Sequence, residues 1–403
     1  MADKKEALSK INAYVDAHRD EMTQFLMDFI AIPSLTYEEG PAVQWLAGKM
    51  KEFGYDEVRI DKVGNVLGRV GSGPSVFLCD AHIDTVEGGD EKAWGFNPFE
   101  TRLEDGVVKG RGAVDDKGCL TGLVFAGRAI KELGLGEEFT YWVSGSVSEE
   151  DVEGSCVEAM TKEAADIKPD FIVVAEASEG RIIRGHKGRA LIRITVPGKA
   201  AHASAAWRGD NALIKALPII DRVDKFQDFV EDPFLGKGTI EVTKVDCKTP
   251  SLNTIPGEVV VICDRRISCG ESIEDLLAEV GEHFKDIPGV VAEIDTENVT
   301  TYTGYDITCV DYFPSWVLPE SHPLIEAGVL AFREQFEEEP TVGKWDFCTN
   351  ATHLCGRMGI PAIGYGPGDG SLCHSTQDQL SVDELVKATK FYASLPLFAA
   401  AAK

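Results

Sequence analysis

The sequence predicts an α/β protein with a mostly parallel sheet, and a second, α+β domain inserted into the first. At the start of the chain, short β-branched runs alternate with long helical patterns. From about Gly185, patterns of half-exposed strands replace this alternation, and it returns from about Val299. The chain has 403 residues, enough for two or three domains. We therefore expect a first domain in two parts, residues 1–186 and 298–403, with residues 187–297 inserted between them.

Apolar runs of two different periods predict the elements of the first domain. Helical spacing predicts one or two helices in residues 4–32 and further helices over 41–53 and 118–133. Continuous apolar runs predict buried strands over 75–79, 141–147 and 170–175. After the insertion, we expect a helix over 323–337, a strand over 360–365 and a closing helix over 382–395.

The inserted segment has its own pattern of half-exposed strands and amphipathic helices. We expect strands over 189–196, 238–245 and 259–267, with helices over 211–226 and 272–284. A length of roughly a hundred residues is typical of an independent domain.

Composition and charge restrict the classes of partner. Lysine and arginine number 40 against 67 acidic residues, a formal net charge of -27, which disfavours nucleic acids and membrane surfaces. No apolar run approaches the length of about 18 residues that a membrane-spanning helix needs. Ten cysteines without a C-x-x-C pair are typical of reduced, mostly buried thiols. We expect a cytoplasmic protein.

The first motif with chemistry follows the strand over 75–79 and reads Asp-Ala-His-Ile-Asp-Thr. In an extended segment, His82 and Asp84 point to the same face, so Asp84 can accept one imidazole N–H while the other nitrogen binds a metal. A histidine that is merely satisfied by a nearby carboxylate at a strand end is the alternative.

Two further motifs bring carboxylates to the ends of strands. The glycine-rich turn Gly110–Gly118 presents Asp115 and Asp116 just before a helix; Asp116 is also a natural helix cap. Glu149 and Glu150 follow the strand over 141–147, so one can bind a metal while its neighbour faces the cavity as a base. A solvated acidic turn is the alternative for this pair.

Glu176 ends another apolar strand, and His374 follows a glycine-rich turn near the end of the chain. Acids and histidines from separate strand ends are typical of a two-metal cage. Mixed carboxylate and imidazole ligands favour two divalent cations, zinc first, with manganese or cobalt as alternatives.

The order of these motifs resembles the M20 family of metallohydrolases, which includes glutamate carboxypeptidase, acetylornithine deacetylase and succinyl-diaminopimelate desuccinylase. The resemblance spans nearly the whole chain and implies a catalytic domain of the zinc-exopeptidase type with an inserted lid and dimerisation domain. It also implies a role for each matching residue: metal ligands at His82, Asp115, Glu150, Glu176 and His374, with Asp115 bridging, Asp84 orienting His82, and Glu149 as the base.

The resemblance also covers the inserted segment. Ala201–Ser204 resembles the family's lid motif, which makes His202 a candidate oxyanion stabiliser in the site of a partner subunit; an ordinary structural histidine is the alternative. Asn253 and Arg266 match segments that contact substrate, with Arg266 as an anion contact. A homodimer through the inserted domain follows. Within the family, residues 181–189 and 208–212 resemble the bacterial branch of selenium-metabolism-linked hydrolases.

The sequence therefore predicts a dinuclear metal-dependent hydrolase that cleaves a C–N amide bond in a small amino-acid derivative. An N-acyl or N-carbamoyl amino acid and a dipeptide are the leading substrates. Glu149 takes a proton from the attacking water, and His202 stabilises the oxyanion. A hydrolytic deaminase on the same metal site and a non-catalytic, dimeric binding relative are the alternatives.

Overall fold

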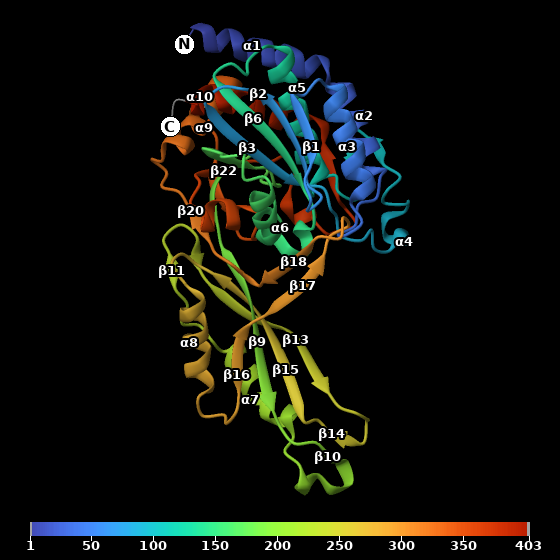
Figure 1. Ribbon diagram of the computed structural model, residues 1–403, viewed down its shortest axis with the longest axis vertical. Coiled ribbons are helices and arrows are strands. Elements are labelled where there is room, and N and C mark those ends of the chain that lie inside the picture. Colours follow the sequence, from blue (N-terminus) through green and yellow to red (C-terminus); the bar gives the residue numbers. More distant parts are fainter. Residues whose placement is uncertain (1, 401–403) are drawn as a thin grey trace.

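The computed structural model describes residues 2–400 and shows two units joined by a narrow waist (Figure 1). The first unit is built on a nine-stranded sheet in the order β1-β2-β6-β3-β7-β22-β8-β20, with β21 paired to β8. Its strands are β1 (Glu57–Ile60), β2 (Val66–Gly71), β3 (Ser75–His82), β6 (Phe139–Ser146), β7 (Phe171–Val174), β8 (Ile182–His186), β20 (Trp316–Val317), β21 (Val342–Trp345) and β22 (Ala362–Gly364).

The centre of this sheet is parallel, as the sequence predicts. β3 pairs in parallel with β6 and β7, and β7 pairs in parallel with β22, whereas β1, β2 and β20 add antiparallel edges. The carboxyl ends of the central strands therefore meet at one edge, where open α/β sheets place their sites. The predicted mostly parallel sheet is confirmed for these central strands.

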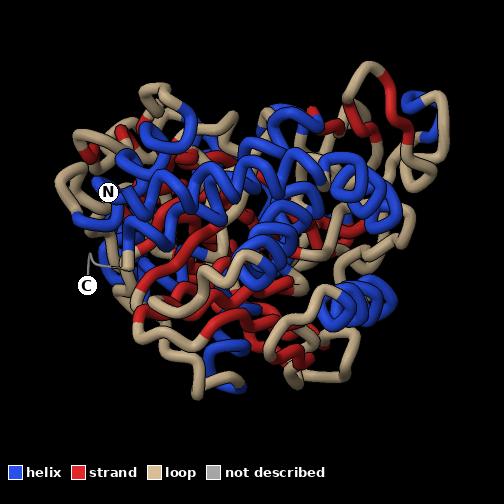
Figure 2. Tube along the Cα trace, turned by 90° about the horizontal axis from the view of Figure 1, so that it is seen from above, coloured by secondary structure: helices blue, strands red, loops and turns tan. Residues whose placement is uncertain are grey.

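Helices cover both faces of the large sheet (Figure 2). One face packs on α1 (Ala2–Ala17), α2 (Arg19–Ile30), α3 (Gly40–Glu52), α5 (Lys117–Glu132), α9 (Pro323–Phe336) and α10 (Val382–Ala399). The other face packs on α6 (Glu149–Glu163) and the short helix η2 (Thr352–Arg357). Alternate residues of β3 divide between these layers: Phe77 and Cys79 join the first core, and Leu78 joins the second.

The second unit has a separate sheet, ordered β13-β15-β9-β16, with β19 also paired to β9. These strands are β9 (Gly188–Pro197), β13 (Thr239–Lys248), β15 (Glu258–Ile267), β16 (Val291–Ile294) and β19 (Tyr312–Phe313). Helices α7 (Ala212–Asp224) and α8 (Ile273–Phe284) pack on it around a core of their own. Because β19 pairs with β9, this sheet recruits chain beyond residue 297, the boundary expected from the sequence.

Short elements complete both units. A three-stranded sheet contains β4 (Arg102–Glu104), β5 (Val107–Lys109) and β23 (Gln379–Ser381), and two short helices are α4 (Glu91–Trp94) and η3 (Gly370–Leu372). The hairpin of β17 (Thr296–Thr300) and β18 (Asp306–Val310) lies at the waist. The second unit also has the hairpin β11 (Glu231–Asp232) with β12 (Gly236–Lys237). At its far tip, β10 (Ala201–His202) pairs with β14 (Thr254–Ile255), followed by η1 (Ala203–Arg208) (Figure 1). Within residues 2–400, no helix is both long and apolar enough to cross a membrane.

Candidate metal centre

Asp115 lies between the two histidines that the sequence singled out. Its Oδ1 is 2.9 Å from Nε2 of His82, and its Oδ2 is 3.3 Å from Nε2 of His374. His82 ends β3, while His374 follows η3 with a positive φ of 58°. The two oxygens of the Asp115 carboxylate therefore lie near different imidazoles. A carboxylate that bridges two metal ions requires this arrangement.

Glu150 and Glu176 complete this group of side chains. Oε2 of Glu150 is 2.9 Å from Nε2 of His374, and Oε1 of Glu176 is 4.0 Å from Nε2 of His82. All five residues proposed as ligands from the sequence are thus brought to one place, from the end of β3, the turn before α5, the first turn of α6, the segment after β7 and the loop after η3.

The donor set fits two divalent cations. Ligand atoms of His82, Asp115 and Glu150 lie within 4.8 Å of one another, and so do those of His82, Asp116 and Glu176. Imidazole nitrogens with carboxylate oxygens suit zinc, manganese or cobalt. Oε1 of Glu150 is buried without a hydrogen-bond partner among residues 2–400, so the protein leaves it a free lone pair.

The pKa values show how strongly this centre attracts positive charge. Burial opposes the charged form of His82, but the carboxylates of Asp115 and Asp84 outweigh it and raise its pKa well above the usual range. Hydrogen bonds to Asp115 and Glu150 raise the pKa of His374 to about 10. Burial and neighbouring carboxylates raise the pKa of Glu176. Cations bound here relieve this repulsion among buried acids.

The side chain of Asp84 accepts hydrogen bonds from the backbone at the start of α6. Its Oδ1 accepts the backbone N–H of Glu149 at 3.1 Å, and its Oδ2 accepts that of Glu150 at 3.1 Å. Nδ1 of His82 lies 2.9 Å from the backbone oxygen of Asp84 and 3.5 Å from its Oδ1. Asp84 therefore faces both the first histidine and the Glu-Glu pair.

Glu149 faces the cavity beside the ligand group. The cavity measures about 280 Å³, and its lining includes His82, Asp115, Glu149, Glu150, Glu176 and His374. Glu149 is only 7% exposed, and burial raises its pKa well above the usual range, with His82 opposing and Glu176 adding to the shift. A buried carboxylate with a raised pKa beside a metal site is suited to proton transfer.

Arg266, the expected anion contact, lines the same cavity. Its Nε donates to Oδ1 of Asp264 at 2.8 Å, and about a third of its side chain, 31%, stays exposed. The end of β15 carries it from the second unit to the metal centre of the first.

His202 and Asn253 lie at the far tip of the second unit, away from the cavity of their own chain (Figure 1). Both are exposed, and Nδ1 of His202 accepts from the hydroxyl of Ser204 at 2.7 Å. Within a single chain, the structure does not bring these two residues together with the other predicted site residues.

Several supporting residues were not predicted from the sequence. Asp378 accepts the backbone N–H groups of Gly112 at 2.6 Å and Val114 at 2.8 Å, which fixes the turn before Asp115. Oε1 of Glu39 accepts the N–H of Ser148 at 2.9 Å, just ahead of Glu149. Neither residue has a local sequence signal: Asp378 lies in a polar stretch after His374, and Glu39 lies just before a helix.

Three other cavity residues also escaped the sequence analysis. Glu153 and Arg189 form an ion pair at 3.2 Å on the cavity wall, and Phe347 lines the same cavity. Glu153 lies in an acidic stretch of α6 that has no separate sequence signal, and the sequence predicts Arg189 in a strand and in the branch-specific segment 181–189, without a role in the site.

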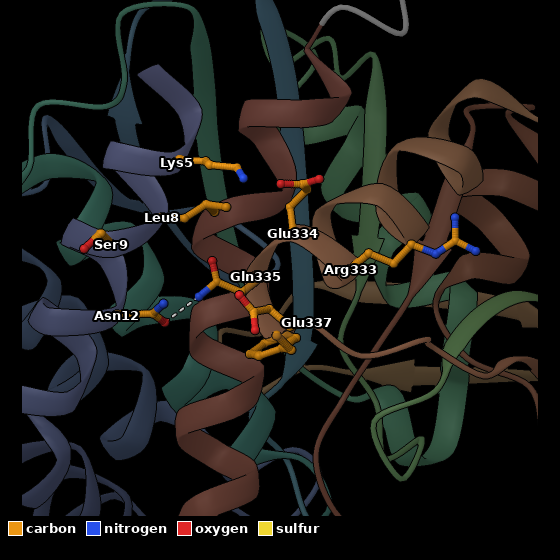
Figure 3. A pocket seen from close by; sticks show the side chains of 9 residues that line it. Lys5, Leu8, Ser9, Asn12, Arg333, Glu334, Gln335 and Glu337 are labelled. Carbon is orange, nitrogen blue, oxygen red and sulfur yellow. Dashed lines mark hydrogen bonds between the residues drawn. The ribbon is translucent and has the colours of Figure 1, made fainter. Parts of the chain in front are cut away.

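A larger pocket of about 620 Å³ lies elsewhere, between α1 and α9 (Figure 3). Within this pocket, Gln335 donates to Asn12, whereas Arg333 pairs at 2.7 Å with Glu339, which lies outside the lining. The lining of this pocket includes no histidine, cysteine or aspartate. Although it is larger, the pocket therefore lacks a group of side chains comparable to that of the metal centre.

Comparison with known proteins decides the family. The family model described as peptidase family M20/M25/M40 matches residues 78–397. The chain belongs to this family. As a member, it is a metallohydrolase, and the resemblance found in its motifs is confirmed.

Three proteins show the similarity of this M20 enzyme to others in sequence and in fold. It is 38% identical over 386 residues to an uncharacterized protein of Escherichia coli strain K12, YgeY, covering 94% of both chains. It is 27% identical over 373 residues to a putative [LysW]-lysine/[LysW]-ornithine hydrolase of Pyrococcus abyssi, covering 92% of this chain and 91% of the relative. The structure of YXEP from Bacillus subtilis, described as a dinuclear metal binding peptidase, has a TM-score of 0.68 at 13% identity, covering 94% and 98%. This last likeness shows the shared fold.

Proposed function

We propose that this M20 enzyme hydrolyses a C–N amide bond in a small amino-acid derivative, either an N-acyl or N-carbamoyl amino acid or a dipeptide. The position of Asp115, with one carboxylate oxygen near each of two histidines, carries the proposal. We assign the ligand roles to His82, Asp115, Glu150, Glu176 and His374, and we expect zinc, with manganese or cobalt as alternatives.

Different residues of the protein have different roles in the proposed reaction. Two divalent cations, when bound, polarise the amide carbonyl and lower the pKa of the attacking water. Glu149 takes the proton from that water and later passes it to the leaving nitrogen. Asp84 orients His82 and fixes the backbone of Glu149, so the base and the ligands keep a constant geometry.

Arg266 gives the cavity a contact for the carboxylate of an amino acid. Its guanidinium group remains partly exposed beside Asp264 and lies in the lining that contains the candidate ligands. A charge-assisted hydrogen bond from this group would fix one end of the substrate and leave the amide at the metal centre.

The proposal includes a homodimer in which the second unit completes the partner's site. Helix α7 exposes Leu213, Ile214 and Leu217, with Ile214 59% exposed, and this apolar face suits a symmetric partner. In such a dimer, we assign His202 to oxyanion stabilisation and Asn253 to substrate contact in the neighbouring site.

A cytoplasmic location belongs to the same proposal. All ten cysteines are free thiols, and seven of them are buried, which is the usage of a reducing compartment. Immunofluorescence in the source cell or fractionation of its extract tests this; recovery with periplasmic or secreted proteins would contradict it.

A hydrolysis screen tests the reaction. The protein is loaded with zinc, manganese or cobalt and offered dipeptides and the N-acetyl, N-succinyl and N-carbamoyl derivatives of amino acids. We expect release of a primary amine from at least one class, detected with a fluorogenic amine reagent. Ammonia as the only product would favour deamination instead. A fully metal-loaded protein that cleaves none of these classes would overturn the proposal.

A further inference from the structure

The hairpin of β17 and β18 at the waist brings three further metal-binding side chains together (Figure 1). Glu297 and Cys309 lie directly opposite each other in the register of the two strands, so their side chains share a face. Asp311 follows Cys309 by two positions, the spacing that returns a side chain to the same face of an extended chain. Ligand atoms of these three residues, here called the waist group, lie within 4.8 Å of one another.

The waist group has a buried end and an exposed end. Cys309 is completely buried, and Asp311 is only 3% exposed. The hydroxyl of Ser155 on α6 donates to Sγ of Cys309 at 3.2 Å, so the buried end faces the first unit. Glu297 is exposed, which gives an ion a path from solvent to the buried ligands.

The buried carboxylate of Asp311 has only distant partners among residues 2–400. Its Oδ1 lies 3.9 Å from Sγ of Cys309 and 3.9 Å from Nη2 of Arg189, and both distances exceed that of an ordinary hydrogen bond to oxygen or nitrogen. Burial raises the pKa of Asp311 to about 7, with Glu297 and Glu153 among the acids that add to the shift. Buried carboxylates are normally paired closely or bound to a metal.

Arg189 does not balance the acids around it. Its Nη1 donates to Oε1 of Glu153 at 3.2 Å, and the same guanidinium group faces Asp311. Its charge also opposes the rise in the pKa of Glu297. One guanidinium group is therefore shared among three carboxylates. The excess of two negative charges is the charge that one divalent cation balances.

An unsatisfied oxygen on α6 also indicates a missing cation. Oε2 of Glu153 is buried without a hydrogen-bond partner among residues 2–400, and the residue is 8% exposed. Arg266, whose charge also reaches Glu153, pairs with Asp264 at 2.8 Å. Because Arg189 contacts both Glu153 and Asp311, this oxygen belongs to the same unbalanced charges.

Apolar packing against α6 does not explain these side chains. Further along the hairpin, on the same face, Val299 and Ile307 lie opposite each other and pack into the core of the first unit. An apolar pair in place of Glu297 and Cys309 would continue this packing without the cost of a charge near the core. Acids and a thiol at this position therefore indicate a function other than contact.

We propose that Glu297, Cys309 and Asp311 bind an additional divalent cation, distinct from those of the candidate metal centre, which holds the hairpin in place against α6. One thiolate and two carboxylates favour zinc or cobalt over magnesium and calcium, which prefer oxygen ligands alone. Cys309 releases its proton to solvent when the cation binds, and the hydroxyl of Ser155 supports the thiolate as an outer hydrogen-bond donor. The site does not depend on which reaction the enzyme catalyses.

Absorption spectroscopy of the cobalt(II) protein tests the proposal. A thiolate bound to cobalt(II) gives a charge-transfer band in the near ultraviolet, and none of the five residues assigned as ligands of the candidate metal centre is a cysteine. We expect this band in the native protein and its loss in Cys309→Ser. A fully cobalt-loaded native protein without the band, or a band that survives in Cys309→Ser, would overturn the proposal.

Two other cysteines serve as controls. Cys263→Ser removes a thiol of β15 whose pKa is raised to about 12 by burial, without a carboxylate that contributes. Cys373→Ser removes a thiol from the lining of the catalytic cavity. Both proteins should keep the band, with circular dichroism showing that they are folded. Loss of the band in either folded variant would place the thiolate elsewhere and overturn the proposal.

Glu297→Gln gives an independent test at the exposed end of the waist group, where the substitution does not disturb the core. Elemental analysis after gel filtration of the zinc-loaded protein should find one ion fewer per chain than in the native protein. Glu293→Gln, an exposed acid on β16 outside the waist group, is the matched control and should bind as much zinc as the native protein. Equal zinc content in Glu297→Gln and the native protein would contradict the proposal.

Asp115→Ala separates the waist group from the candidate metal centre. This substitution removes the carboxylate between His82 and His374 and leaves the hairpin unchanged. The cobalt-loaded variant should keep the thiolate band while it loses cations from the candidate metal centre. A band that disappears together with those cations would show that the thiolate belongs to that centre, and would refute a separate site. Failure of the proposed hydrolysis leaves the band, and hence this inference, unaffected.

Discussion

Nδ2 of Asn253 lies 3.4 Å from Nε2 of His202, at the tip of the second unit and far from the metal centre of the same chain. The two residues come from segments about fifty positions apart that β10 and β14 bring together. Two exposed polar side chains in contact, on an element that protrudes from the body, suit a site that is completed between subunits.

Shared sites predict complementation between two inactive variants. Mixing His202→Ala with Glu149→Gln subunits creates heterodimers in which one site has both a normal Glu149 and a normal partner His202. Each heterodimer should recover about half of the native activity, because one of two symmetric sites is intact. Native mass spectrometry verifies the mixed dimers. Verified heterodimers without recovery, or a monomeric native enzyme, would refute shared sites.

Asp115→Ala should release metal. The substitution removes the carboxylate that faces both histidines, so both cations lose a ligand at once. We expect less than two metal ions per chain by elemental analysis after gel filtration, with circular dichroism showing that the fold persists. Asp224→Ala, at the exposed end of α7, serves as the control and should retain the native metal content. Two ions per chain in Asp115→Ala would contradict a bridging role.

Glu149→Gln should slow turnover but spare metal binding. The amide keeps the size of the side chain and removes its basicity, so kcat should fall by about 10² to 10⁴. Metal content, measured in parallel, should match that of the native enzyme, since Glu149 is not among the assigned ligands. Glu52→Gln, an exposed site at the end of α3, is the control. Native turnover in Glu149→Gln would exclude its role as the base.

Glu39→Ala should destabilise the start of α6. Glu39 is fully buried and is the acceptor for the N–H of Ser148, so truncation leaves that donor unpaired. Such a loss costs about 1 to 3 kcal/mol in the free energy of unfolding. Glu39→Gln retains a side-chain oxygen and should lose less. Urea denaturation of the metal-free proteins gives both values, and equal stability of Glu39→Ala and the native protein would exclude this role.

The buried side chain of His186 should make the free energy of unfolding depend on pH. The residue is fully buried, and burial lowers its pKa from 6.5 to about 4. The unfolded chain therefore binds a proton that the folded chain rejects, so this stability is complete above pH 6.5 and is lost as the pH falls toward 4. His186 by itself should contribute a slope of up to about 1.4 kcal/mol per pH unit in metal-free protein. His186→Phe should flatten this slope, and an unchanged slope would contradict the assignment.

Strand ends made the metal centre predictable from the sequence. His82 and Glu176 each follow an apolar run, and parallel strands bring their carboxyl ends to one edge, so the grouping of these ligands follows from local patterns. The central helices and strands were predicted for the same reason, as β3, α5 and α7 show.

Contacts between distant segments could not be predicted in this way. Arg189 and Glu153 meet because β9 starts at the waist and α6 breaks at Val152, and neither feature has a local signature. The antiparallel edge strands, such as β1 and β20, are short and half-buried, so their apolar patterns are weak. Glu39 is similar: its acceptor role depends on Ser148, 109 positions later.

The carboxylate of Asp378 also determines how much of the chain must be present before the candidate metal centre can form. It fixes the turn before Asp115 from 264 positions further along, close to the last ligand, His374. A chain that reaches only as far as Gly370 therefore contains four of the five candidate ligands, but it lacks both the carboxylate that fixes the turn and the second histidine. Tight binding of divalent metal at this centre should therefore require residues 371–378: a chain truncated after Gly370 should lose that metal to a chelator that the full chain resists.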